Sequence, residues 1–170
     1  MPATPDALFA RLAALGIATE TVWHEPVFTV EEAQAKRGEL PGTHCKCLFL
    51  RDKKGALWLA VVEESRRVDL KALAARLGAD RFSFGSPDRL MRHLAVEPGS
   101  VTPFALINDA AGEVRVALDA TMMAGGTLYY HPLTNRATTR ISAADLLRFI
   151  AATGHEPVLV DFDAAAEPPG

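Results

Sequence analysis

Two apolar runs joined by a short polar turn constrain the fold of this chain more than any other feature. Residues 43–64 read THCKCLFLRDKKGALWLAVVEE, and both arms are rich in residues that favour strands. Residues 52–55, DKKG, include the Asp and Gly that tight turns prefer. We therefore predict a β-hairpin over 43–64, which requires the fold to contain a sheet.

Strand-like and helix-like segments alternate along the rest of the chain. Four helix starts carry a capping residue, with Ser or Thr directly before Pro in two of them and a Ser142/Asp145 capping box in a third. Because hairpin strands mix with separate helices, we predict an α+β fold with a mostly antiparallel sheet. The expected helices cover 4–16, 30–38, 69–79, 86–96 and the residues after Ser142, and further strands are expected within 18–24, 81–84, 97–109, 113–123, 124–135 and at both ends of 138–162.

The length and charge of the chain exclude several classes of protein. Its 170 residues suit one domain (1–170), and no apolar run approaches the roughly 18–20 residues of a membrane helix. The net charge is −3, whereas proteins that wrap long nucleic acids usually carry a basic excess. Lys46, Arg51, Lys53 and Lys54 form a local basic cluster that can still contact a few phosphates. Two cysteines and no signal-peptide pattern lead us to expect a reducing, cytoplasmic location.

The two cysteines of the chain, Cys45 and Cys47, suggest a metal or redox site at first sight. A structural zinc site needs about four Cys or His ligands, and most of the histidines are scattered along the sequence. We expect the two thiols to diverge to opposite faces of a strand, which disfavours both a shared metal and a disulfide. Buried packing is the favoured interpretation. A cysteine nucleophile is disfavoured, because Lys46 would face away from both thiols.

Three further features carry candidate functional residues. Lys46 interrupts an apolar strand and shares a face with His44, so it either lies on an exposed edge or lines a cleft. Residues 99–103, GSVTP, form a Gly-x-x-x-Pro loop that either offers backbone groups to a small polar ligand or is a plain connecting turn. His131 precedes a proline, and it either acts as a base or lies in a surface turn. The residues alone leave these alternatives open.

Five separated segments, taken in order, resemble the YbaK/prolyl-tRNA synthetase-associated domain family. They read HCKCLFLRDKKGALWLAVV, RFSFGSPDRL, EPGSVTPFALIND, HPLTNRATTRIS and LLRFIAATGHEPVLVDF, and the resemblance covers nearly the whole chain. It is greatest to the free-standing deacylases that remove alanine from mischarged tRNA(Pro). The resemblance implies a curved mixed sheet packed with helices and a cleft for the aminoacylated 3′ acceptor end of tRNA. It also implies ester hydrolysis without a metal or other cofactor.

The resemblance also assigns roles to individual residues. It implies that Lys46 is the essential strand lysine and that His131 is the histidine before proline, with a ribose hydroxyl as the alternative base. It implies that Arg81 contacts the acceptor stem. The family usually has asparagine directly after the lysine, where this chain has Cys47. The substrate loop implied by the resemblance consists of Gly99, Ser100, Val101, Thr102 and Pro103.

Three hypotheses about function follow from these observations. The first is a deacylase whose partner is aminoacylated tRNA, with prolyl-tRNA synthetase as a second candidate partner. The second is a non-catalytic tRNA- or synthetase-binding module, because Cys47 replaces the family's asparagine. The third is a metal or redox protein that uses Cys45 and Cys47. The sequence leaves the preferred mischarged amino acid and the oligomeric state open.

Overall fold

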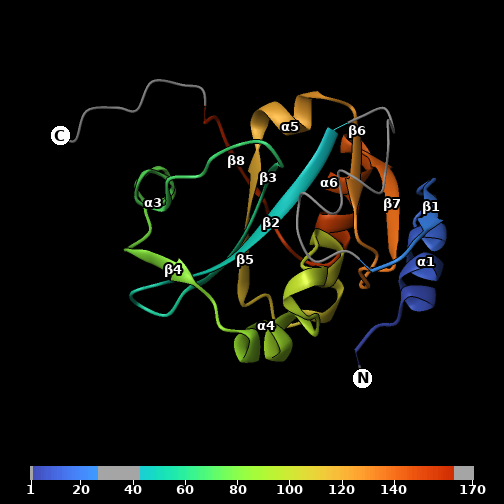
Figure 1. The fold of residues 1–170 in the computed structure, drawn as a ribbon, viewed down its shortest axis with the longest axis horizontal. Helices are drawn as coiled ribbons and strands as arrows, with labels where there is room; N and C mark the ends of the chain where they lie inside the picture. Colours follow the sequence, from blue (N-terminus) through green and yellow to red (C-terminus); the bar gives the residue numbers. More distant parts are fainter. Residues whose placement is uncertain (1, 27–42, 163–170) are drawn as a thin grey trace.

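The computed structural model describes residues 2–26 and 43–162, and these form a twisted mixed sheet with helices on both faces (Figure 1). The strands are ordered β1-β7-β6-β2-β3-β5-β8, and β4 pairs with β2 outside this path. Four of the described pairings are antiparallel and three are parallel, which confirms the predicted α+β fold with a mostly antiparallel sheet. The strands are β1 (Glu20–Trp23), β2 (Thr43–Asp52), β3 (Leu57–Glu63), β4 (Phe82–Phe84), β5 (Val114–Asp119), β6 (Thr127–Tyr130), β7 (Ala137–Ser142) and β8 (Val158–Val160).

Side-chain caps fix the starts of the helices, as their sequences predict. Thr4, Ser86 and Ser142 each accept a backbone N–H from three residues later at 3.1 Å, and Asp69 accepts from Lys71 at 2.9 Å. No helix among the described residues is both long and apolar enough to cross a membrane. The helices are α1 (Pro5–Ala14), α3 (Leu70–Leu77), α4 (Pro87–Leu94), α5 (Ala120–Ala124) and α6 (Ala143–Ala152), with 3₁₀ turns η1 (Pro98–Ser100) and η2 (Pro103–Asn108).

The predicted hairpin is confirmed as the antiparallel pair β2 and β3. Its register sets Lys46 opposite Val62 and Leu50 opposite Trp58. The buried Asp52 carboxylate closes the turn by accepting the backbone N–H groups of Lys54 and Ala56 at 3.0 and 2.8 Å. Burial alone would raise the pKa of Asp52, but these and further backbone N–H donors lower it below its usual value.

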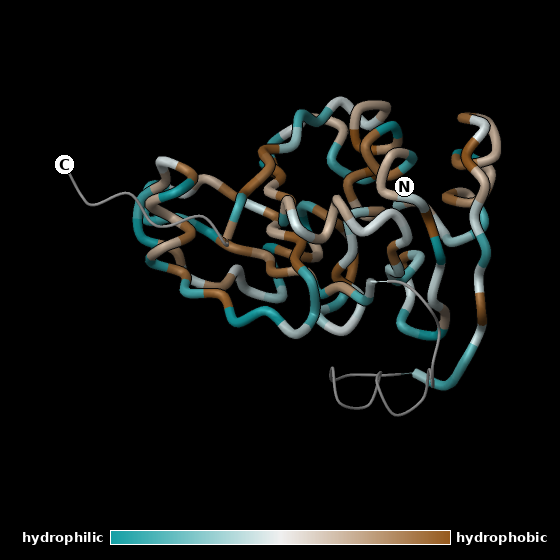
Figure 2. The backbone as a smooth tube through the Cα atoms, turned by 90° about the horizontal axis from the view of Figure 1, so that it is seen from above, coloured by the Kyte–Doolittle hydropathy of each residue, from teal (hydrophilic) through white to brown (hydrophobic). Residues whose placement is uncertain are grey.

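The two faces of the sheet pack against two separate hydrophobic cores. The larger core joins one face of β2, β3 and β5 to side chains of α1, α4, α6 and η2. The smaller core joins the other face of the same strands to Leu73 and Ala74 of α3, near the hairpin turn. Apolar segments concentrate inside the molecule, and hydrophilic segments lie mainly at its periphery (Figure 2). Since α3 covers only the hairpin end, the second face of β1, β7, β6 and the start of β2 lies outside the smaller core.

One predicted strand is wrong, and two expected segments lie outside the described residues. The apolar run within 97–109 forms η2 rather than a strand, because Pro103 begins it and the Thr102 hydroxyl accepts the Phe104 N–H at 3.2 Å. A short buried apolar run has no periodicity that distinguishes helix from strand. The expected helix at 30–38 and the tail at 163–170 are not described.

Candidate active site

The candidate site lies where one edge of strand β2 changes its pairing partner from β6 to β4. One edge of β2 pairs with β3 over residues 45–51. The other edge pairs first with β6 at Thr43 and His44, and then with β4 over residues 50–52. Between these two pairings, no strand of the described part pairs with residues 45–48 on this edge. We call this gap the β2 fork, and Lys46 lies in it.

Lys46 projects from the fork on the face opposite the larger core. Its neighbours Cys45 and Cys47 pack against the larger core, whereas Leu48, on the same face as Lys46, packs against the smaller core. Lys46 is half-buried, so its stem lies along the protein while its ammonium group can reach solvent or a ligand. The structure therefore places the predicted lysine on a part of the sheet face that, within residues 2–26 and 43–162, neither core covers.

Aromatic side chains lie next to Lys46 on this face. The His44 ring, two residues before Lys46 along β2, stacks on Tyr129 of β6 with ring centroids 4.5 Å apart and planes 6° from parallel. Tyr129 is buried, so the stack forms a firm wall at the β6 side of the fork. The stack therefore fixes the orientation of the His44 ring beside Lys46.

His131 follows β6 and is held by the neighbouring strand β7. Its Nδ1 donates to the Ala137 carbonyl oxygen at 2.8 Å, because that oxygen can only accept. This tautomer leaves a lone pair on Nε2 of the neutral ring. Burial lowers the pKa of His131; the Ala137 contact opposes this, and the nearby His24 lowers the pKa further. His131 is therefore neutral at pH 7, as a general base must be.

His24 completes a polar row across β7. Its Nε2 lies 2.8 Å from the Thr138 hydroxyl, and its Nδ1 lies 2.7 Å from the Glu25 carbonyl oxygen. The rings of His24 and His131 meet edge to face at 6.3 Å. No local pattern in the sequence identifies His24 or Tyr129 as residues on the face of Lys46. Strand alternation around Lys46 already placed His44, but the pairing of β2 with β6 is set by contacts far apart in the sequence.

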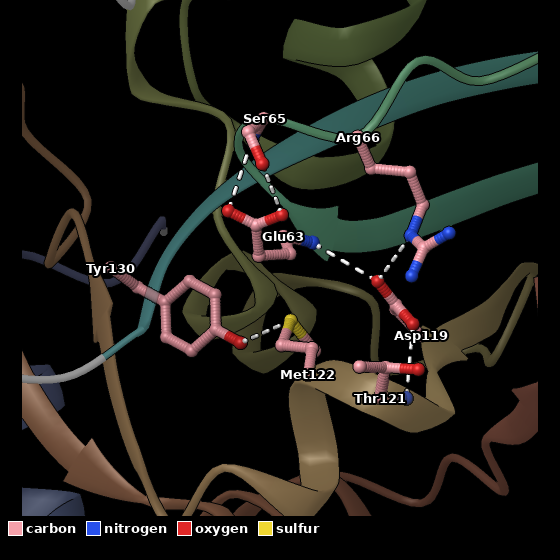
Figure 3. A network of polar contacts seen from close by, with 7 residues as sticks. All are labelled: Glu63, Ser65, Arg66, Asp119, Thr121, Met122 and Tyr130. Atoms are coloured by element: carbon pink, nitrogen blue, oxygen red, sulfur yellow. Dashed lines mark hydrogen bonds and ion pairs between the residues drawn. The ribbon is translucent and has the colours of Figure 1, made fainter. Parts of the chain in front are cut away.

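A buried carboxylate anchors the strand end opposite Lys46. Asp119 is fully buried, and its Oδ2 accepts from Nε of Arg66 at 2.8 Å and from the Glu63 N–H at 3.3 Å (Figure 3). Its Oδ1 accepts from the Thr121 N–H at 3.1 Å. Because Glu63 ends β3 next to Val62, the network fixes the backbone that pairs with Lys46. Asp119 is thus a support for the site rather than part of it.

The structure corrects the predicted divergence of the two cysteines. Cys45 and Cys47 lie on the same face, because residues two apart in a strand share a face, and both pack against the larger core. Burial raises the pKa of Cys45 to about 12 and that of Cys47 well above its usual value. Both thiols are protonated at neutral pH and turned away from Lys46, which makes them poor nucleophiles. Among the described residues, no group of three or more His, Cys, Asp or Glu side chains is arranged to hold a metal.

The predicted substrate loop packs on the core side of the sheet. Ser100 donates its N–H to the Glu97 carbonyl at 2.8 Å, and Val101 packs against the larger core. Ser100 and Thr102 are buried, and Gly99 is half-buried. No hydrogen bond within the described part joins residues 99–103 to Lys46 or His131. The structure thus brings Lys46 and His131 to one face of the sheet but does not join the loop to them.

Arg81 lies at the far end of β2 from Lys46. It directly precedes β4, whose first residue pairs with Asp52, and its side chain is exposed. Six residues of strand separate Lys46 from Asp52, which corresponds to roughly 20 Å. Arg81 and Lys71 line an open hollow between α3 and β4. This separation suits contacts to two different parts of one large ligand.

Comparisons with known proteins agree on one family. Residues 24–149 match the family described as "Aminoacyl-tRNA editing domain". A prolyl-tRNA synthetase associated domain-containing protein 1 of Bos taurus is 43% identical over 162 residues, which cover 92% of this chain and 94% of the relative. The prolyl-tRNA editing protein ProX of Acetoanaerobium sticklandii is 36% identical over 151 residues, which cover 88% of this chain and 92% of the relative.

Solved structures share the fold at low sequence identity. A candidate trans-editing enzyme for prolyl-tRNA synthetase superposes with a TM-score of 0.71 at 20% identity, over 95% of this chain and 98% of its own. A hypothetical protein superposes with a TM-score of 0.74 at 18% identity, over 91% of this chain and 97% of its own. At this identity the likeness concerns the arrangement of helices and strands.

Proposed function

Because the chain belongs to the aminoacyl-tRNA editing domain family, we propose that it is a trans-editing hydrolase that deacylates mischarged tRNA(Pro), with alanyl-tRNA(Pro) as its substrate. The observation that carries the proposal is that a strand lysine and a neutral histidine lie on the same face of the sheet, on a part that neither core covers among the described residues. The single domain acts in the cytoplasm, where translation takes place, with prolyl-tRNA synthetase as a second candidate partner. The reaction uses no metal or other cofactor.

The two side chains divide the chemistry of ester hydrolysis. An aminoacyl ester is already activated, so a bound water needs only positioning, a base and a stabilised oxyanion. The Lys46 ammonium supplies a point charge that can hold the terminal phosphate or ribose, or the carbonyl oxygen as it gains negative charge. His131 Nε2 supplies the base that takes the proton of the attacking water, and a ribose hydroxyl remains the alternative base. The proton then passes to the leaving ribose oxygen, and the released acid gives up the remaining proton of the water to solvent and departs as a carboxylate.

The remaining predicted residues act in binding. The Gly99–Pro103 loop, which packs on the core side of the sheet, supports the substrate site from beneath rather than through N–H groups at the ester, and a small pocket excludes the larger proline side chain. Such exclusion must be steric, because one methylene in an open apolar site discriminates only about 10–200-fold. Arg81 contacts the acceptor stem, which its position about 20 Å from Lys46 supports.

The decisive experiment measures deacylation of alanyl-, cysteinyl-, seryl- and prolyl-tRNA(Pro) by the protein and by its Lys46→Ala variant. We expect release of alanine by the native protein and a loss of at least about 100-fold in the variant, as for removal of one oxyanion donor. Circular dichroism checks that the variant folds. Arg148→Ala, which removes one positive charge from helix α6 outside the β2 fork, serves as the matched control and should retain activity.

Two outcomes would contradict the proposal. Full activity of Lys46→Ala would remove the lysine from the mechanism. Salt-sensitive tRNA binding without turnover on any mischarged tRNA would instead favour the second candidate, a non-catalytic binding module. The observation that favours this module is Cys47 in the position of the family's asparagine. In the structure Cys47 faces the larger core, so this substitution leaves the face of Lys46 unchanged.

A further inference from the structure

An exposed aromatic ring lies between Lys46 and Arg81 along strand β2. Phe84 ends β4 and pairs with Leu50, so it shares a face with Leu50, Leu48 and Lys46. Its side chain is 64% exposed, although Phe82 on the same strand is buried against Trp58. Phe84 therefore lies at the β4 side of the fork. The His44–Tyr129 stack lies at the β6 side, beyond the unpaired edge of β2.

The backbone around Phe84 is held firmly. Gly85 donates its N–H to the Phe49 carbonyl at 2.8 Å. A Cβ atom on Gly85 would lie 2.3 Å from the Phe49 ring, so only glycine allows this close approach. The chain thus accepts a close contact that keeps the end of β4 against β2, and Phe84 is presented from it at a fixed position.

Positive charge surrounds this end of the molecule. Lys53 and Lys54 are exposed in the hairpin turn next to β4, and Arg81 precedes the strand. Lys71, on helix α3, lines the same hollow as Arg81. In Figure 1, the hairpin turn, β4 and α3 lie together at one end of the molecule. Asp80 also lines this hollow, but the four cations outnumber it, so the surface around Phe84 complements a polyanion, although the chain as a whole carries a charge of −3.

We propose that Phe84 is a stacking platform for an unpaired base of the tRNA 3′ end. The inference rests on the proposed function, because the ester must reach Lys46 while the stem lies at Arg81. The nucleotides between them are single-stranded and must then pass Phe84. Unpaired bases bind proteins by stacking on aromatic side chains, and this mode tolerates any base. Phe84 is a positioning residue in this account and does not touch the ester.

The test compares the affinity of two uncharged tRNA(Pro) molecules, one intact and one lacking its unpaired 3′ nucleotides. The proteins are the native chain and its Phe84→Ala, Phe84→Trp and Phe84→Leu variants. One stacked base contributes about 1–3 kcal/mol, which corresponds to roughly 5- to 150-fold in affinity. We expect removal of the 3′ nucleotides to lower the tRNA affinity of the native protein and of Phe84→Trp by this factor. The same removal should lower the affinity of Phe84→Ala much less. Phe84→Leu should resemble Phe84→Ala, because leucine keeps the apolar surface but lacks an aromatic face.

Leu159→Ala is the matched control, because Leu159 is 56% exposed on strand β8, outside the fork. This variant should bind both tRNA molecules as the native protein does.

An equal effect of trimming on all variants would overturn the proposal, as would native-like binding by Phe84→Leu. Weaker binding of Phe84→Ala to prolyl-tRNA synthetase with unchanged tRNA binding would overturn it in favour of a protein contact. Because affinity is measured without turnover, Phe84-dependent binding by a protein that hydrolyses nothing would refute only the proposed hydrolysis. Native protein that binds neither tRNA would refute both.

Discussion

Lys46 and His131 differ in how tightly the protein holds them. His131 is fixed by its bond to the Ala137 carbonyl, and its ring meets His24. Lys46 depends instead on the strand that carries it, with a flexible stem and a charged end. A fixed base and an adaptable cation suit a substrate whose ester must align with one water while its phosphates differ in position.

The activity of the native protein should fall at acidic pH if His131 is the base. Its pKa lies below the usual 6.5, mainly because of burial, so the neutral form predominates above that pH. We expect kcat/KM for alanyl-tRNA(Pro) to be level near pH 7 and to fall about tenfold per pH unit below the pKa of His131. The His131→Gln variant should lose this acidic limb together with much of its activity.

The substrate amino group also titrates near neutral pH, so the variant profile is the necessary reference. A profile of His131→Gln that keeps the same acidic limb would assign the limb to the substrate and favour the ribose hydroxyl as base. His24→Gln is a second control. Because a charged His24 lowers the pKa of His131, its removal should move the limb to higher pH.

Individual residues could be predicted from the sequence where a local rule decides. Strand alternation predicts that Lys46 shares a face with Leu48, and in the structure Lys46 lies half-buried in the fork while Leu48 packs against the smaller core. The cysteines were misplaced although alternation gives residues 45 and 47 the same face, and the packing against the larger core makes this plain. The contact between the His131 and His24 rings could not be predicted from the sequence, because it requires β1 and β6 to flank β7.

At the scale of the elements, capped helices and the hairpin were predictable because their signals lie within a few residues. The turn of β2 and β3 and the caps at Thr4, Asp69 and Ser86 all follow from such signals. The β2 fork was not predictable, since it requires β6, which begins at Thr127, to pair in parallel with the start of β2. Parallel pairing depends on contacts distant in sequence and leaves no local turn signal.

The end of β3 should lose stability when its buried carboxylate is removed. In Asp119→Ala, Nε of Arg66 loses the carboxylate that it contacts, and the N–H groups of Glu63 and Thr121 lose their acceptor. Breaking a buried ion pair costs about 3–5 kcal/mol, and the lower value applies because Arg66 keeps some contact with solvent. Urea unfolding measures the loss in free energy of unfolding.

Asp145→Ala provides the control for this loss. Asp145 pairs with Arg148 within one helix at 2.9 Å near the surface, and such pairs contribute only about 0.3–0.5 kcal/mol. Equal losses in the two variants would show that Asp119 does not anchor β3. Deacylation by Asp119→Ala should also fall, because the strand opposite Lys46 is less firmly held.

At the scale of the whole molecule, charge is distributed unevenly. The chain is acidic overall, yet exposed cations gather around the hairpin turn and β4, while the candidate catalytic residues lie further along β2. This distribution favours binding to one short segment of nucleic acid rather than contact along a whole tRNA. The contact strength should therefore come from a few phosphates and from Phe84.

The salt dependence of tRNA binding tests this view of the molecule. Each neutralised phosphate contributes about −0.9 to the slope of log K against log salt for a duplex and about −0.7 for a single strand. With four candidate cations, we expect a slope between about −3 and −4. The cations are Lys53, Lys54, Lys71 and Arg81.

Arg81→Ala should weaken binding and make this slope shallower by about 1, because one phosphate contact is lost. Arg148→Ala removes an equal charge from helix α6 and should leave both the affinity and the slope unchanged, since Arg148 is held by Asp145 and the Leu15 carbonyl. A native slope steeper than about −6 would mean that many more cations touch the tRNA. In that case the ligand would extend well beyond the strip from Lys46 to Arg81, and the acceptor end alone could not account for binding.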